Sequence, residues 1–232
     1  MEYLDKVKAA ADQMMGGGQK EKVVLTYFPI ASRGEVARLI CAVGGLDFEN
    51  NATGALPEGE VPIDYMSPKS MPMLKHGDFK MAQSLPVEAY AASIAPLYSG
   101  LTPQQKAIDG TVCAIKEDIN AGCIKLLFDG CEDAAKVREL LDPWFKIIEH
   151  KCPESGFFHG LAFPTAADFA VFVVTNGYMP FQGLFKQAGL GETWYEADYP
   201  KLAALAKRTG EYPAVKDYLA SSTTLKQAAF GK

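Results

Sequence analysis

The sequence of 232 residues is poor in the residues that build metal and redox sites. It has three histidines, at positions 76, 150 and 159, and five cysteines, at 41, 113, 123, 131 and 152. No two cysteines form a Cys-x-x-Cys pair, and no His/Cys cluster has the spacing of zinc ligands. We therefore expect no metal site, and we expect the cysteines to be reduced thiols, most of them in the core.

Long apolar runs and an excess of positive charge are also missing. The longest uninterrupted apolar run is Phe169–Val174, far below the roughly 20 residues that span a bilayer. The net charge is -5, whereas nucleic-acid binders are usually basic. Residues 1–20 lack the apolar stretch of a secretory signal and contain acids, which mitochondrial presequences avoid. The sequence thus predicts a cytoplasmic protein that binds neither nucleic acid nor a membrane.

Enough apolar material for a folded core is present, 48% of the residues, and it follows two different patterns. Residues 22–96 alternate strand and helix signals, which predicts an α/β domain. Residues 104–232 show helical periodicity alone, which predicts an all-α domain, and the Pro/Gly-containing residues 97–103 form a linker. Residues 1–21 are an N-terminal extension whose helical pattern ends at a Gly16–Gly18 hinge.

The expected elements follow one another in this order. In the α/β part we predict a strand, a helix, an irregular segment, a hairpin and a helix capped by Ser84, at 23–28, 34–43, 46–68, 71–81 and 85–95. In the all-α part we predict six helices, near 104–128, 132–149, 165–178, 183–188, 199–208 and 213–220. Thr165 and Asp168 have the spacing of a capping box ahead of an apolar run, which indicates a structural role.

Four stretches resemble the glutathione transferase family. They are LTYFPIASRGEVARLI at 25–40, SMPMLKHGDFKMAQSLPVEAY at 70–90, FPTAADFAVF at 163–172 and EYPAVKDYL at 211–219. The first stretch is most similar to the tyrosine-type cytosolic enzymes, the sigma class in particular. The resemblance implies a thioredoxin-like glutathione-binding domain before the all-α domain. It also implies glutathione as co-substrate, a hydrophobic electrophile as second substrate, and a homodimer.

The resemblance implies that Tyr27 is the catalytic residue. A thiol has a pKa of about 8.5, so little of it is ionised at neutral pH. A phenol that donates a hydrogen bond to the thiolate lowers that pKa. The resemblance also implies that Arg33 supports Tyr27 electrostatically, because a nearby cation favours the anion. Ser32 is the rival hydroxyl, since serine-type relatives use a serine near this turn.

The resemblance places glutathione-binding residues at three further positions. It implies a cis peptide at Met71–Pro72, where backbone groups of Met71 would pair with the cysteinyl part of glutathione. At Gln83–Ser84, a helix start and a hydroxyl group would hold the γ-glutamyl end, as suits a carboxylate. Glu117 falls where relatives place an acid that reaches across a dimer interface to the γ-glutamyl amine, with Asp118 as the alternative.

One segment departs from the family pattern. Tyrosine-type relatives hold the glycyl carboxylate with a Trp and a Lys from the segment before the cis proline, but residues 39–68 contain no Lys, Arg or Trp. They contain five acids instead, at 47, 49, 58, 60 and 64. Lys69 is the nearest cation that could compensate, and Lys75 is another. The departure puts the affinity for glutathione in question.

Three functions remain open at this point. The first is conjugation of glutathione to a hydrophobic electrophile, with Phe28, Leu127 and Phe128 as candidates for the electrophile pocket. The second is a sigma-type isomerase that acts on a peroxide such as a prostaglandin precursor. The third is a non-catalytic relative that binds a ligand or serves a structural role.

Overall fold

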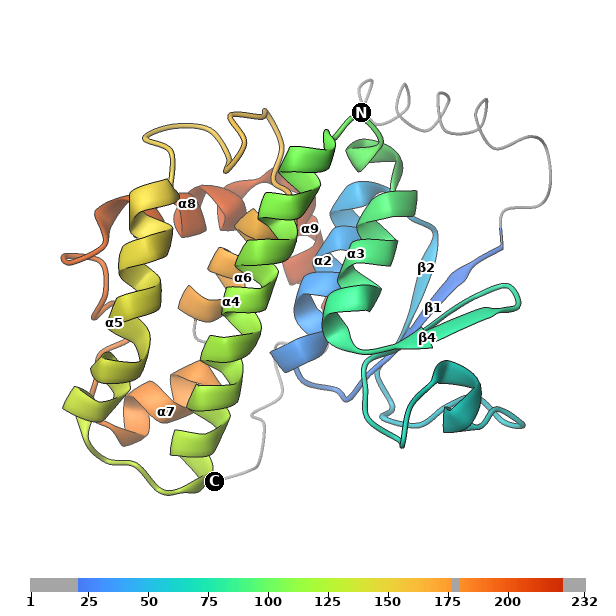
Figure 1. The fold of residues 1–232 in the computed structure, drawn as a ribbon, viewed down its shortest axis with the longest axis horizontal. Helices are drawn as coiled ribbons and strands as arrows, with labels where there is room; N and C mark the ends of the chain where they lie inside the picture. The colour runs from blue at the N-terminus through green and yellow to red at the C-terminus, as the bar shows by residue number, and fades with distance from the viewer. Residues whose placement is uncertain (1–20, 177–179, 223–232) are drawn as a thin grey trace.

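The computed structural model describes residues 21–176 and 180–222, and it shows a small sheet beside a larger group of helices (Figure 1). The helix predicted in the N-terminal extension lies outside the described residues. Helices α2 (Glu35–Gly44) and α3 (Ser84–Ile94) stand between the sheet and the helices of the C-terminal half (Figure 1). The expected α/β and all-α parts are therefore both present, while the exact domain boundaries given above remain predictions.

The sheet has four strands in the order β2-β1-β3-β4. Their bounds are β1 Val23–Thr26, β2 Phe48–Asn51, β3 Met73–His76 and β4 Phe79–Ala82. Strand β1 is parallel to β2 and antiparallel to β3, and β3 is antiparallel to β4. The predicted first strand and hairpin are thus confirmed. The hairpin's first strand begins only at Met73, after the proline at position 72.

Strand β2 corrects the prediction of an irregular segment over 46–68. Its sequence, Phe-Glu-Asn-Asn, is largely polar and lies half-exposed at the sheet edge. It therefore lacks the alternation that identifies a strand. Its pairing with β1 places Asn51 beside Thr26, and the Asn51 side-chain amide donates to the Ala55 carbonyl at 2.9 Å. The same segment contains a short 3₁₀ helix, η2, at Pro62–Tyr65.

Apolar side chains cover both faces of the sheet. Helices α2 (Glu35–Gly44) and α3 (Ser84–Ile94) pack against each other. With β1, β3 and β4 they enclose a core that contains Leu25 and Leu74. On the other face, Tyr65 of η2 packs with Met73. Three of the four β1 residues are buried and Val24 is half-buried, which agrees with an apolar run that is continuous rather than alternating.

The C-terminal half confirms the six predicted helices. They are α4 Pro103–Phe128, α5 Ala134–Lys151, α6 Ala166–Thr175, α7 Phe181–Gln187, α8 Pro200–Glu211 and α9 Pro213–Ser221. Helix α6 is buried along its whole length and contacts α2, α4 and α8, so it is the centre of this half. All five cysteines are free, and four are buried, as predicted.

Two predicted absences concern only the described part of the chain. No helix within 21–176 and 180–222 is long and apolar enough to cross a bilayer. In the same residues, no group of three or more His, Cys, Asp or Glu side chains could hold a metal ion.

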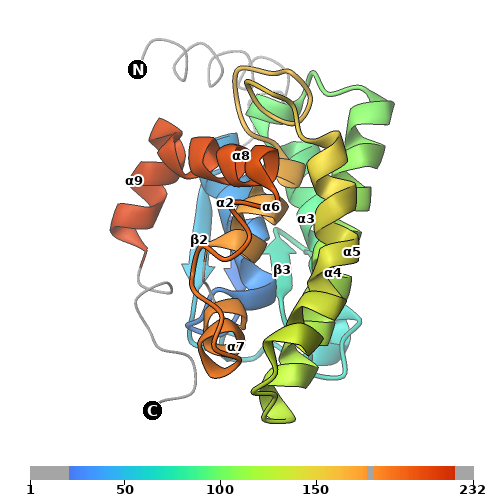
Figure 2. The same cartoon turned by 90° about the vertical axis from the view of Figure 1, so that its left-hand side faces the viewer.

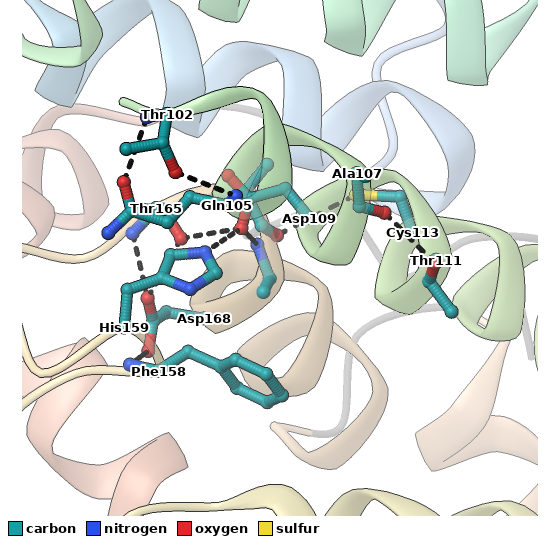
Figure 3. A network of polar contacts seen from close by, with 12 residues as sticks. Thr102, Gln105, Ala107, Asp109, Thr111, Cys113, Phe158, His159, Thr165 and Asp168 are labelled. Carbon is teal, nitrogen blue, oxygen red and sulfur yellow. Dashed lines mark hydrogen bonds and ion pairs between the residues drawn. The ribbon is translucent and has the colours of Figure 1, made fainter. Parts of the chain in front are cut away.

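The capping box predicted at the start of α6 belongs to a buried polar network (Figure 3). Asp168 Oδ2 accepts the backbone N–H of Thr165 at 2.8 Å, and Oδ1 accepts that of Phe158 at 2.9 Å. Asp109 of α4 accepts the Thr165 hydroxyl and His159 Nε2, both at 2.8 Å. The network therefore fixes α6 to α4 and to the loop that precedes α6.

We predict that Asp168→Ala lowers the free energy of unfolding by about 2–4 kcal/mol, because it leaves two N–H groups of this network without partners. Burial raises the pKa of Asp168 to about 6, so urea unfolding should be measured at pH 8, where the carboxylate is ionised. The matched control is Gln105→Ala in the exposed capping box of α4, which involves Thr102. It should cost less than about 1 kcal/mol. Equal losses of unfolding free energy in the two variants would show that the buried capping box contributes no more to stability than the exposed one.

Candidate active site

The register of the sheet brings most of the predicted site residues to one edge. Thr26 pairs with Met73, and Met73 pairs with Ala82. Tyr27 and Gln83 come directly after a residue of this row in the sequence, and Pro72 comes directly before one. Because β3 runs antiparallel to β1 and β4, all three lie one residue beyond the row at the same edge of the sheet. Register alone therefore gathers three segments that are far apart in the sequence.

Tyr27 is held tightly by its backbone and ring. Its N–H donates to the Asn51 carbonyl and its own carbonyl accepts the N–H of Gly54, both at 3.0 Å. The side chain is 4% exposed. A Cβ at position 34 would lie 2.5 Å from Cδ1 of the Tyr27 ring, so glycine is required there. Within the described residues the Tyr27 hydroxyl has no hydrogen-bond partner, so it remains able to donate.

Arg38 is a functional candidate that the sequence reasoning missed. It lies on α2 and is fully buried, with its Cζ 5.4 Å from the centroid of the Tyr27 ring. Its guanidinium donates to the carbonyls of Phe28 and Ile30, at 2.9 and 2.7 Å, and to Asn50 Oδ1 at 2.9 Å. Arg38 thus fixes the turn that follows Tyr27.

The charge of Arg38 is balanced by Glu35, which is also fully buried, with Nη1 and Oε2 3.1 Å apart. The sequence signal for this ion pair was an acid and a base at i and i+3 inside an otherwise apolar helix. An isolated buried charge is very costly, so such a pair indicates a built feature.

Arg33 does not contact Tyr27 through any hydrogen bond in the structure. It follows the turn in η1 (Ser32–Gly34), and its Nε lies 2.8 Å from Glu117 Oε2 on α4. Glu117 also forms an ion pair with Lys116 at 2.9 Å, and Lys116 pairs with Glu88 of α3 at 2.5 Å. Glu117, predicted to reach a second copy, is thus paired within its own chain.

The structure confirms the cis peptide at Met71–Pro72. No hydrogen bond to the Met71 backbone occurs within the described part of the chain, which leaves its N–H and C=O available. The predicted cap at Ser84 is wrong, because Gln83 occupies the N-cap position with φ 78° and without a side-chain capping bond. Ser84 is instead the first residue of α3 and is buried, so its N–H is among the free donors of a helix start.

Glu60 and Asp64, two of the acids of the 46–68 segment, are paired with lysines. Glu60 lies 2.6 Å from Lys75 and 3.9 Å from Lys80, and Lys80 lies 3.3 Å from Asp64. Burial raises the pKa of Glu60, but Lys75, Tyr65 and Lys80 outweigh it and hold that pKa below its usual range. Lys69 is exposed and has no ion-pair partner among the described residues.

The rival hydroxyl and the candidate pocket residues have different environments. Ser32 is buried in η1 with φ 37°. Phe28 and Phe128 are 45% and 67% exposed. A separate cavity of about 430 Å³ lies between α3 and α4, and none of the predicted site residues lines it. The chemistry of the candidate site is therefore not located in that cavity.

Comparisons with known proteins agree with this geometry. A family model described as the glutathione S-transferase C-terminal domain matches residues 117–222. A Dictyostelium discoideum protein provisionally named glutathione S-transferase alpha-3 is 27% identical over 208 residues, which cover 85% of this chain and 94% of that relative.

Solved structures extend the similarity over most of the chain. A Caenorhabditis elegans glutathione S-transferase has 25% identity and a TM-score of 0.66, covering 87% of this chain and 98% of its own. The chain has the glutathione S-transferase fold. A monomeric glutathione S-transferase from Necator americanus, 19% identical with a TM-score of 0.66, covers 90% of this chain and 100% of its own. Together the comparisons support the assignment of this chain to the glutathione S-transferase family and its interpretation as a glutathione S-transferase enzyme.

We predict that Glu117→Gln lowers the free energy of unfolding by about 1–2 kcal/mol at pH 7, because it removes the charge that faces Arg33 and Lys116. Burial raises the pKa of Glu117, but the two cations outweigh it and hold that pKa below its usual range. A lowered acid pKa contributes stability above the unfolded pKa of about 4.3, and this is lost as pH falls through the folded pKa.

The difference between Glu117→Gln and the wild type should therefore close below about pH 4. Urea unfolding across this range provides the measurement. The exposed neighbour Asp118 is the matched control, and Asp118→Asn should change stability by less than about 0.5 kcal/mol at any of these pH values. A constant deficit for Glu117→Gln at every pH would contradict the ion pairing.

Proposed function

We propose that this chain is a tyrosine-type glutathione transferase, most similar to the sigma class, that conjugates the glutathione thiolate to hydrophobic electrophiles. The observation that carries the proposal is the position of Tyr27. It follows β1 in line with the cis peptide and with Gln83, and its hydroxyl is unpaired within the described residues. Such an enzyme would serve detoxification in the cytoplasm, as a homodimer.

Activation of glutathione needs a donor that prefers the thiolate to the thiol. A phenol is both a hydrogen-bond donor and an acceptor, so the Tyr27 hydroxyl can donate to the thiolate. Each unit by which it lowers the thiol pKa corresponds to about 1.4 kcal/mol of preferential stabilisation of the anion. Arg33 lies beyond the same turn, where its guanidinium pairs with Glu117, and we propose that it supports Tyr27 from there electrostatically. The thiolate then attacks the electrophile.

Binding of the tripeptide uses the backbone as well as side chains. The free N–H and C=O groups of Met71 would pair with the cysteinyl part, as in strand addition to a sheet. The start of α3, with Gln83 and Ser84, would receive the γ-glutamyl carboxylate, because helix N-termini bind anions. Lys69, two residues before Met71, would face the glycyl carboxylate. The ion pairs of Glu60 and Asp64 remove most of the repulsion that their charges would cause.

We predict that Tyr27→Phe folds and still binds glutathione, but loses conjugation activity about 10- to 100-fold. This loss of rate corresponds to the free energy of one hydrogen bond to a charged group. Initial rates with an activated aryl chloride provide the measurement, and calorimetric titration checks binding. Ser32→Ala is the matched control for the rival hydroxyl, expected within about threefold of the wild type. Full activity in Tyr27→Phe with loss in Ser32→Ala would reject the tyrosine type.

We predict that Lys69→Met weakens glutathione binding about three- to tenfold and that high salt narrows this difference, because the contact is an exposed charge pair. Lys75→Met is the control, since Glu60 already engages Lys75. Titration calorimetry of the wild type and both variants measures the effect. Equal weakening by both substitutions would mean that Lys69 has no specific contact. No binding by the wild type would favour the non-catalytic alternative.

A further inference from the structure

The C-terminal helix contacts the helix that supports the candidate catalytic tyrosine. Helix α9 packs against α2, and Figure 2 shows it at the opposite side of the molecule from α5. The Tyr218 hydroxyl donates to Glu35 Oε1 at 2.8 Å, across 183 positions of the sequence. Burial and the neighbouring Glu35 raise the pKa of Tyr218, so its phenol stays protonated and keeps donating.

The two oxygens of Glu35 face different partners. Oε1 accepts from Tyr218, while Oε2 accepts from Arg38 Nη1 at 3.1 Å. Arg38 in turn donates to the carbonyls of Phe28 and Ile30. A continuous series of hydrogen bonds thus runs from α9 to the turn immediately after Tyr27, and each of its inner members is fully buried.

We infer that Tyr218 is a positioning residue for Tyr27, acting through the buried ion pair of α2. The inference rests on the proposed function, since it concerns how the thiol is activated. Without the Tyr218 hydroxyl, Glu35 Oε1 would lose its partner in a fully buried environment, where an unpaired acceptor is unfavourable. The carboxylate would turn or take up a proton, and Arg38 would lose the anchor that orients it toward the turn. Tyr27 would then aim its hydroxyl less accurately at the thiolate.

The test compares Tyr218→Phe with Tyr195→Phe. Each variant loses one hydroxyl and one hydrogen bond, but the Tyr195 hydroxyl donates to the Thr175 carbonyl at the end of α6 and not to α2 or the turn. Two readouts are needed. Amide hydrogen exchange of the peptide that spans residues 27–35, in the free protein, reports on the turn. The pKa of bound glutathione, followed by the absorbance of its thiolate, reports on activation.

In Tyr218→Phe we expect exchange in this peptide to rise about threefold or more, the thiol pKa to rise by about half a unit, and kcat/KM for glutathione to fall about threefold at neutral pH. Tyr195→Phe should leave all three at their wild-type values. Glu35→Gln should reduce the effect of adding Tyr218→Phe, because residues in one network do not act additively.

The possible results separate the inference from the proposed function. Unchanged exchange in Tyr218→Phe would overturn the inference. Faster exchange with an unchanged thiol pKa would overturn it as well, because the contact would then be structural only. Additive effects with Glu35→Gln would show that Tyr218 acts by another route, which also overturns it. A wild-type protein that fails to lower the thiol pKa would overturn the proposed function, and the positioning role would fail with it.

Discussion

One row of backbone pairing determines where chemistry can occur in this molecule. Thr26, Met73 and Ala82 are neighbours across three strands, so the residues that follow this row come together whatever their side chains are. A shift of one residue in either pairing would turn alternate side chains to the opposite face and separate Tyr27 from the cis proline. Val23 and Leu25 lie in the core formed with α2 and α3. A one-residue shift would put Val24 and the polar Thr26 there instead, which opposes such a shift. The candidate site therefore depends first on the core of the sheet.

The second constraint is electrostatic, and it joins the two parts of the chain. Buried charges require partners, and the partners here come from distant elements. Arg33 reaches Glu117 of α4, Lys116 of α4 reaches Glu88 of α3, and the ion pair of α2 reaches α9. The helices thus do more than cover the sheet, because their polar side chains fix the segments that carry the proposed chemistry.

The local elements could be predicted because their signals are local. Strand β1 is a continuous apolar run, and α2 and the six later helices show hydrophobic periodicity. Gly or Pro residues lie near the ends of these elements and of the hairpin. Strand β2 was missed since three of its four residues are polar and the segment becomes a strand only by pairing with β1. The incorrect cap at Ser84 has a related cause. Sequence favours a hydroxyl at the cap, but the backbone places Gln83 there with φ 78°.

The candidate site was predictable in its parts and not in its connections. Tyr27, the cis peptide and the residues at the start of α3 were found by resemblance. Lys75 was a reasonable compensating cation until its pairing with Glu60 became visible, because a formal charge count does not say which charges are already matched. The contact between Tyr218 and Glu35 has no signal in a single sequence. Its two members are 183 positions apart, and each has a plausible role alone, as a surface tyrosine and a helix-start acid. Long-range polar contacts of this kind follow from the packing of α9 on α2, so they emerge only once the apolar faces have determined the fold.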